Sequence, residues 1–308
     1  MRTALIVDAA CDLPTDYCLQ NDIHILPMGV VSGEERYFDY RDMDITKGFY
    51  NDYTHFRATD AYSLPPSVDV ISSYITEFIA KYYDQAFIMC LSSSRSNLYK
   101  FAIEAGKQAM QSIRDVRGDA TNHLKNLRIM DTQTVFTGQA VLAYEAQRVI
   151  QVIKQVDSQE LYEVLRVLSD NIHVYTVPND LYYIRSRANL RGEKSFGTLS
   201  YAIGRSFDVK PIVLTKNGMT SKAGRGKGFI EAVGRLFQMV KNAIDAGLMI
   251  NAVMLSYSGD TREITKLNSF RSLQGYAENE GVRVYVSVMS TAAGINVGPG
   301  ALSVAYCG

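Results

Sequence analysis

The sequence predicts an α/β protein in two parts: an N-terminal parallel sheet sandwiched by helices (residues 1–156) and a C-terminal α+β part (residues 157–308). Two patterns lead to this prediction. Strand-like and helix-like segments alternate along the first half, an order typical of a parallel sheet covered by helices. In the second half, Asn217-Gly218 separates two strand-like runs, which is a strong hairpin signal among helices.

The first half contains four apolar runs of strand length. They span residues 5–7, 24–31, 86–91 and 127–130, and Pro27 should break or edge the second. Helices are expected from Pro14, from Ser67, over 96–113 and over 134–155. In the helix capped by Ser67, apolar residues recur at helical spacing and predict one buried face: Ile71, Ile75, Phe78, Ile79 and Tyr82.

The second half combines a hairpin with further strands and helices. Strands are expected at residues 172–177, 210–215, 219–223, 250–257, 282–288 and 301–307. A short helix capped by Asp180 and a long amphipathic helix over 226–246 complete this part.

Composition excludes several classes of protein. The 308 residues suffice for one large domain or two ordinary ones, and 47% hydrophobic with 21% charged residues is normal for a soluble protein. The 32 basic and 32 acidic residues cancel, which argues against a general nucleic-acid binder. We find no apolar run long enough to span a membrane and no signal peptide, so stable membrane insertion is not expected.

The cysteines indicate a reducing, cytoplasmic location. They lack the spacing of a metal or redox motif, and we expect four free thiols and no metal site: Cys11, Cys18, Cys90 and Cys307.

A polar loop follows the third strand-like run. Ser92-Ser-Ser-Arg-Ser-Asn97 would lie at the carboxyl end of a parallel strand and at the start of a helix, where ligands and anions bind. Capping by one serine is an equally good interpretation, although it accounts for one hydroxyl of four. Asp8 and Asp12 should lie at the same sheet edge, and for Asp12 we favour a role as helix cap. In the loop near residue 65, Ser63 is a candidate ligand donor.

Two glycine-rich segments have alternative interpretations. Gly224-Arg-Gly-Lys-Gly228 looks like a phosphate loop but matches neither standard motif, so a solvated basic turn is favoured. Gly298-Pro299-Gly300, beside Asn296, could bring backbone N–H groups close to a ligand or could form a tight turn into the last strand. From this segment alone, the tight turn is the favoured interpretation. A hydrolase is not supported, because there is no G-x-S-x-G motif and the four histidines are scattered.

Short motifs occur in a fixed order along the whole chain. They are Asp8-Ala-Ala-Cys-Asp-Leu-Pro14, Leu26-Pro-Met-Gly-Val30, Tyr62-Ser-Leu-Pro-Pro66, Ser92-Ser-Ser-Arg-Ser-Asn-Leu-Tyr99, Asp131-Thr-Gln-Thr with Gly138, Phe207-Asp-Val-Lys-Pro-Ile212 and Gly298-Pro-Gly-Ala301. Each is weak alone, but the ordered set resembles the DegV family, bacterial fatty-acid-binding proteins that serve fatty acid kinase.

The resemblance implies a fatty acid in a tunnel between the two domains. Its carboxylate would be held by hydroxyls of two loops and by a histidine near the C-terminus. A separate kinase would phosphorylate the bound carboxylate, so the protein would be a carrier rather than an enzyme, with no cofactor beyond the lipid. By position, Ser63 and Ser96 keep the family hydroxyls.

The chain departs from the family pattern at the lipid head group. The family histidine falls on Asn296 and the threonine before it on Ile295, while Asn97 replaces a glycine. The family's Gly-Gly-Arg falls on Arg187-Ala188-Asn189, which displaces or removes its arginine. A neutral amide therefore replaces a group that can be cationic.

We therefore expect lipid binding to persist with an altered head-group pocket. Its expected residues are Ser63, Ser96, Asn97, Ile295 and Asn296, and the candidate contacts to a partner or an anion are Arg187 and Arg225. Two other functions stay open. One is an enzyme acting on a small phosphate or acyl compound through the Ser92–Ser96 loop with Arg225 and Lys227. The other is a non-catalytic regulatory or interaction protein.

Overall fold

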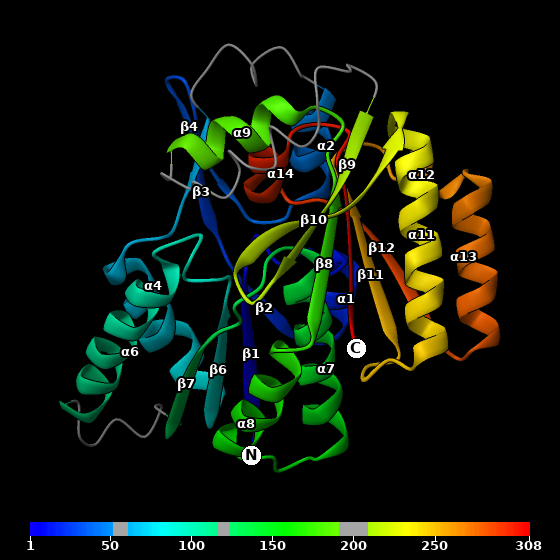
Figure 1. Cartoon of the computed structure of the whole chain (residues 1–308). Coiled ribbons are helices and arrows are strands. Elements are labelled where there is room, and N and C mark those ends of the chain that lie inside the picture. Colours follow the sequence, from blue (N-terminus) through cyan, green and yellow to red (C-terminus); the bar gives the residue numbers. More distant parts are fainter. Residues whose placement is uncertain (52–60, 116–122, 191–208) are drawn as a thin grey trace.

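The computed structural model describes residues 1–51, 61–115, 123–190 and 209–308, with the side chains of 187–190 excepted (Figure 1). A four-stranded parallel sheet and a six-stranded mixed sheet form its two halves, and a third, smaller sheet has three strands. The predicted combination of a parallel N-terminal sheet with a separate, mainly antiparallel C-terminal sheet is confirmed.

The N-terminal sheet has the order β2-β1-β6-β7, and all its strands run parallel. Its strands are β1 (Thr3–Asp8), β2 (Ile23–Leu26), β6 (Gln85–Cys90) and β7 (Asn126–Asp131), and its helices are α1 (Thr15–Gln20), α4 (Val68–Tyr74), α5 (Ala80–Tyr82), α6 (Leu98–Asp115), α7 (Thr137–Val152) and α8 (Ser158–Ser169). Alternate residues of β1 enter different hydrophobic clusters: Ile6 packs with α4 and α6, and Val7 with α7 and α8. The sheet is thus buried on both faces, as its apolar strands predict.

The helix after Ser67 differs from the predicted one. Ser67 caps it as expected, its Oγ accepting from the N–H of Val70. A π-helical turn, η1 (Ile75–Ile79), then lies between α4 and α5 and widens the helix. The buried side chains of this helix therefore recur every four residues, at Ile71, Ile75 and Ile79. The prediction that Phe78 and Tyr82 are buried is wrong, because each side chain is about half exposed.

The C-terminal sheet has the order β10-β9-β8-β13-β11-β12, in which only β11 and β12 run parallel. Its strands are β8 (Ile172–Val177), β9 (Val209–Lys216), β10 (Met219–Lys227), β11 (Ala252–Tyr257), β12 (Arg283–Val288) and β13 (Leu302–Cys307), and α11 (Gly228–Ala246), α12 (Arg262–Thr265) and α13 (Asn268–Asn279) accompany them. The predicted hairpin joins β9 and β10, and Asn217 and Gly218 both take positive φ, as a tight two-residue turn requires.

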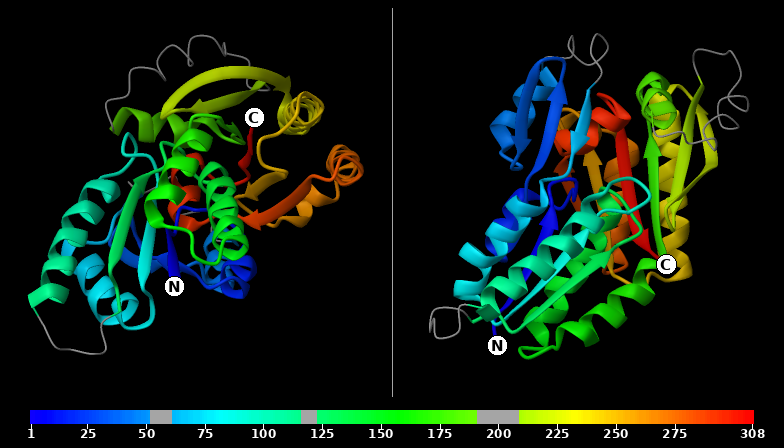
Figure 2. Two further views of the ribbon diagram at one scale, coloured as in Figure 1. Left: turned by 90° about the horizontal axis from the view of Figure 1, so that it is seen from below. Right: turned by 90° about the vertical axis from the view of Figure 1, so that its left-hand side faces the viewer.

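The sequence did not predict the three-stranded sheet. Its strands β3 (Met28–Ser32), β4 (Glu35–Asp39) and β5 (Tyr62–Leu64) are antiparallel in the order β4-β3-β5, and Pro27 separates β3 from β2. This sheet lies at the end of the molecule opposite the N-terminus, together with α2 (Met43–Asn51), α9 (Leu181–Leu190) and α14 (Thr291–Val297) (Figure 2). β4 is mostly exposed and has no apolar run, which is why its pattern gave no strand signal.

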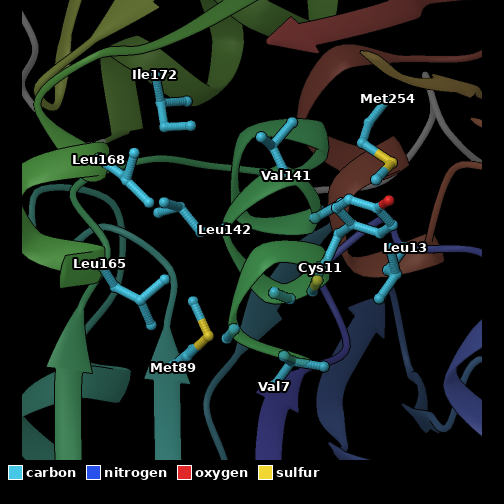
Figure 3. Close-up of a cluster of buried hydrophobic side chains, with 14 of the residues drawn as sticks. Val7, Cys11, Leu13, Met89, Val141, Leu142, Leu165, Leu168, Ile172 and Met254 are labelled. Carbon is cyan, nitrogen blue, oxygen red and sulfur yellow. The ribbon is translucent and has the colours of Figure 1, made fainter. Parts of the chain in front are cut away.

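Helix α7 lies between the two large sheets. It packs against β1 on one side and against β8, β11 and β13 on the other. A single hydrophobic cluster therefore contains Val7 and Met89 of the first sheet with Met254 of the second, around Val141 and Leu142 of α7 (Figure 3). The division after residue 156 stays a prediction, since the core is continuous across it.

All four cysteines are buried and free of disulfides. Within the described residues, no helix has the length and apolarity that a membrane crossing needs, and no cluster of three metal-ligating side chains occurs.

Candidate functional site

A cavity of about 250 Å³ lies between the N-terminal sheet and the C-terminal hairpin. The chain segments after β1, β6 and β7 contribute to one wall, so the site occupies the carboxyl edge of the parallel sheet, as expected for this architecture. The residues that line it are Ala10, Met28, Ser63, Leu64, Pro65, Leu91, Arg95, Ser96, Asn97, Val135, Phe136, Thr176, Ile184, Val213, Thr215, Thr220, Ala292, Asn296 and Val297.

Four of the predicted site residues meet at this cavity. Ser63 comes from β5, Ser96 and Asn97 from the turn before α6, and Asn296 from the last turn of α14. Ser96 Oγ accepts from the N–H of Leu98 at 3.1 Å, which leaves its hydroxyl proton to donate elsewhere. Asn296 Nδ2 donates to the carbonyl of Ala292 at 2.8 Å, and its side chain is half-buried.

The other predicted residues lie differently. Ile295 is absent from the lining: it is buried in the hydrophobic cluster around α4 and α6, because successive helical residues point about 100° apart. Arg225 is exposed on β10 and does not line the cavity. Arg187 belongs to α9, but its side chain lies outside the described residues.

Arg95 contributes a positive charge to the cavity lining. It belongs to the serine-rich loop, but it was not among the predicted site residues. Its Nη2 donates to Thr220 Oγ1 at 2.6 Å and to the carbonyl of Gly218 at 3.4 Å. The N–H of Gly218 in turn donates to the carbonyl of Gln133 at 2.9 Å. The hairpin tip is therefore tied to the N-terminal loops at the cavity.

A row of threonines forms the opposite wall, which the sequence analysis missed. Thr215 and Thr220 are cross-strand partners on β9 and β10, and Thr176 pairs with Val213 on the same face of the sheet. The alternation of inward and outward side chains within each strand could have indicated which face each threonine occupies. The three hydroxyls come together only through the register between the strands.

Buried polar groups fix the start of α14, the helix that carries Asn296. Asp39 Oδ2 accepts from Thr291 Oγ1 at 2.7 Å and from the N–H of Ala292 at 3.0 Å, while Ser290 Oγ caps the helix through the N–H of Ala293. Tyr50 donates its hydroxyl proton to the carbonyl of Ser290 at 2.9 Å. Such fully bonded networks hold a helix end in one position.

Asp12 belongs to the same network, so its favoured role as a helix cap is wrong. Helix α1 begins after Pro14 without a side-chain cap. The carboxylate of Asp12 instead accepts from Arg41, from Ser256 Oγ and from the N–H of Ser290, and so joins the N-terminal part to the C-terminal sheet.

Asp8 fastens two loops that line the cavity. Its carboxylate accepts from the N–H groups of Ala10 and Leu91, at 3.0 and 2.8 Å, and from Gln139 Nε2 at 2.8 Å. Burial raises the pKa of Asp8 from 3.8 to about 6, although these hydrogen bonds oppose the rise.

The Gly298-Pro299-Gly300 segment forms a tight turn before the last strand, which is the interpretation that the sequence favoured. The N–H of Gly298 donates to Gly294 and that of Gly300 to Ser258, so neither is directed at a ligand. A side chain at Gly298 would meet the ring of Tyr183, with only 2.3 Å between Cβ and the ring carbon Cδ2. This glycine permits close approach of α9 rather than of a ligand.

Comparison with known proteins decides the family. Residues 2–308 match the family model described as "Uncharacterised protein, DegV family". A DegV domain-containing protein of Xanthomonas campestris pv. campestris is 32% identical over 99% of this chain and 97% of its own length, and one of Xanthomonas axonopodis pv. citri is 33% identical over the same shares. The chain belongs to the DegV family.

Solved structures of fatty-acid-binding proteins share the fold of this chain. A stearic-acid-binding protein from Eubacterium ventriosum aligns with a TM-score of 0.80 and 18% identity, covering 99% of this DegV chain and 98% of its own. DegV from Bacillus subtilis, described as a fatty acid binding protein, aligns with a TM-score of 0.77 and 19% identity, covering 100% and 99%. At these identities the likeness establishes the fold.

Proposed function

We propose that this DegV protein binds a fatty acid or a related lipid in the cavity between its two sheets. The carboxylate lies at the polar end formed by Ser63, Ser96, Asn97 and Asn296, and the acyl chain contacts apolar side chains that include Met28 and Ile184. The observation that carries the proposal is the combination, in one cavity, of an apolar lining with converging hydroxyl and amide groups. Relatives of the same fold are described as binding stearic acid and other fatty acids.

The energetics of the proposal are favourable. A saturated C16 chain has about 14 methylenes, each worth about 0.8 kcal/mol on burial, or on the order of 11 kcal/mol before association costs. The cavity of about 250 Å³ is slightly smaller than the roughly 300–1,000 Å³ usual for ligand sites, so a long chain must displace lining side chains.

The head group is bound by neutral groups and by the start of a helix. The dipole at the N-terminal end of α6 favours an anion beside Ser96 and Asn97, although the N–H of Leu98 already donates to Ser96 Oγ. Arg95 adds a positive charge to the cavity wall while it bonds to Thr220. These features support carboxylate binding without the family histidine.

We propose a carrier role in the cytoplasm, with the lipid presented to a separate enzyme such as a fatty acid kinase. The four buried, unpaired thiols suit a reducing compartment. The apolar lining favours the lipid over the alternative of an enzyme for a small phosphate compound, and Arg225, which that alternative would use, is exposed away from the cavity.

Paired alanine substitutions test the site. Ser63→Ala combined with Ser96→Ala should weaken palmitate binding about tenfold, since hydrogen bonds to a charged group contribute about 1.5–3 kcal/mol when buried and less when half exposed. Ser93→Ala is the matched control, because Ser93 is exposed in the same loop and does not line the cavity. Equal palmitate affinities for the double variant and the control would contradict the placement of the carboxylate.

A further inference from the structure

Strand β7 leaves one edge of the N-terminal sheet open. It is the outer strand in the order β2-β1-β6-β7, and no described strand pairs with its far edge (Figure 1). The N–H of Thr132 donates to the carbonyl of Cys90 at 3.0 Å, which fixes the alternation of the parallel ladder. The peptide groups of Leu127 and Ile129 therefore point away from β6, and their N–H and C=O groups can pair with another strand.

A groove runs beside this open edge. It has a volume of about 700 Å³ and is bounded by α6 and α8, with Leu127, Arg128 and Ile129 of β7 between them. Its apolar lining includes Ile103 and Met110 of α6. A six-residue strand such as β7 is about 20 Å long, which suits an extended segment of similar length.

The groove is strongly basic. Lys107, Arg114 and Arg128 line it, and Lys125 joins Arg114 and Arg128 around an adjoining hollow. None of these four cations forms an ion pair with a carboxylate in the part of the chain that the structure describes. The carboxylate that borders the hollow, Asp157, is occupied in capping α8 through the N–H of Gln159.

The positive charge of the groove determines which kind of strand can bind at the β7 edge. A second copy of the chain would bring the same four cations against the first, so pairing of two β7 edges is disfavoured. An acidic segment would instead be attracted electrostatically to each of the four cations.

We propose that the edge of β7 binds an extended, acidic segment of a partner protein by strand addition. The segment pairs with the outward peptide groups of Leu127 and Ile129, and its carboxylates face Lys107, Arg114, Lys125 and Arg128. The docking site adjoins the lipid cavity through α6: Asn97, just before the helix, lines the cavity, and Tyr99, in its first turn, lines the groove. A partner bound here would lie beside the proposed head-group end.

The direct test uses the full chain and a labelled eight-residue peptide of alternating glutamate and valine. Fluorescence anisotropy should show saturable binding, and hydrogen exchange at the Leu127 and Ile129 amides should slow at least tenfold in the complex. A peptide of the same sequence in which every backbone nitrogen is methylated keeps the charge but loses all the N–H donors, and it should bind at least tenfold more weakly. Absence of binding, or equal binding of the methylated peptide, would overturn the proposal.

Charge reversal supplies a second test. Lys107→Glu combined with Arg128→Glu alters two exposed side chains and should weaken binding of the glutamate–valine peptide at least tenfold. Lys47→Glu combined with Lys81→Glu makes the same change in net charge at exposed sites on α2 and α5, and should change the affinity less than twofold. Equal losses in the two variants would indicate unspecific attraction and contradict a defined site on β7.

Discussion

Arg41 and Asp12 form an ion pair closed to water, with 2.9 Å between Arg41 Nη1 and Asp12 Oδ1. Arg41 Nη2 also donates to the carbonyl of Leu13. Through Ser256 and Ser290 the pair reaches the C-terminal sheet and the helix that carries Asn296. A buried contact between the two halves of the chain thus determines where one wall of the cavity lies.

Removing one partner of this pair should be strongly destabilising. Arg41→Met leaves the Asp12 carboxylate buried without its counter-charge, and should lower the free energy of unfolding by about 3–5 kcal/mol. Urea denaturation measures the effect. The reference is Arg166→Met at the exposed Arg166–Glu163 pair, which should cost less than about 1 kcal/mol. Similar losses for the two variants would refute the structural role of Arg41.

Asp8 should make stability depend on pH in an unusual direction. Its folded pKa is about 6 against 3.8 for the free side chain, so the folded state binds the proton more tightly. The contribution of Asp8 to stability is therefore greatest below pH 3.8, falls as the pH rises towards 6, and is constant above that. The shift corresponds to about 3 kcal/mol.

Comparison with Asp8→Asn isolates this contribution. Unfolding free energies of both proteins are measured from pH 3.5 to pH 7, and the advantage of the wild type over the variant should shrink by about 2–3 kcal/mol over that range. A pH-independent difference between the two proteins would exclude the raised pKa of Asp8.

Two glycine-to-alanine substitutions should change the free energy of unfolding in opposite directions. Gly298 has φ 84° and ψ 167°, a region essentially restricted to glycine, and its Cβ would strike the Tyr183 ring. Gly298→Ala should therefore lower the free energy of unfolding by at least about 2 kcal/mol. Gly275→Ala, inside α13 with no atom within 4 Å of the new methyl group, should raise it by about 0.5–1 kcal/mol. Thermal and urea unfolding check both.

Restoring an imidazole at the proposed head-group end should strengthen fatty-acid binding at low pH. Asn296→His places a group with a pKa near 6.5 at the cavity, so palmitate should bind about threefold more tightly at pH 5.5 and with unchanged affinity at pH 8. Asn279→His, on the exposed end of α13, is the control. If the affinity of Asn296→His follows that of the control at both pH values, Asn296 does not contact the carboxylate.

Local sequence patterns predicted much of the fold. The parallel strands, the Asn217-Gly218 hairpin and the Ser67 cap depend on neighbouring residues, so composition and spacing identify them. The π-turn after Tyr74 and the exposed strand β4 lack such local signals. Their conformations depend on packing against distant segments.

The candidate site was predictable in part for the same reason. The resemblance and the loop pattern identified Ser63, Ser96, Asn97 and Asn296, all of which line the cavity. The threonine wall depends on strand register, and the role of Asp12 depends on Arg41, 29 positions away along the chain. Long-range pairings of this kind cannot be inferred from spacing within one segment.

The central claim, that this DegV protein carries a lipid between its sheets, is tested most directly by mass spectrometry of material extracted from the purified protein. We predict one fatty acid or related lipid per chain. Its amount should fall in Ser63→Ala/Ser96→Ala and stay unchanged in Ser93→Ala. Extracts of the wild-type protein without any lipid, together with no binding of added palmitate, would contradict the claim.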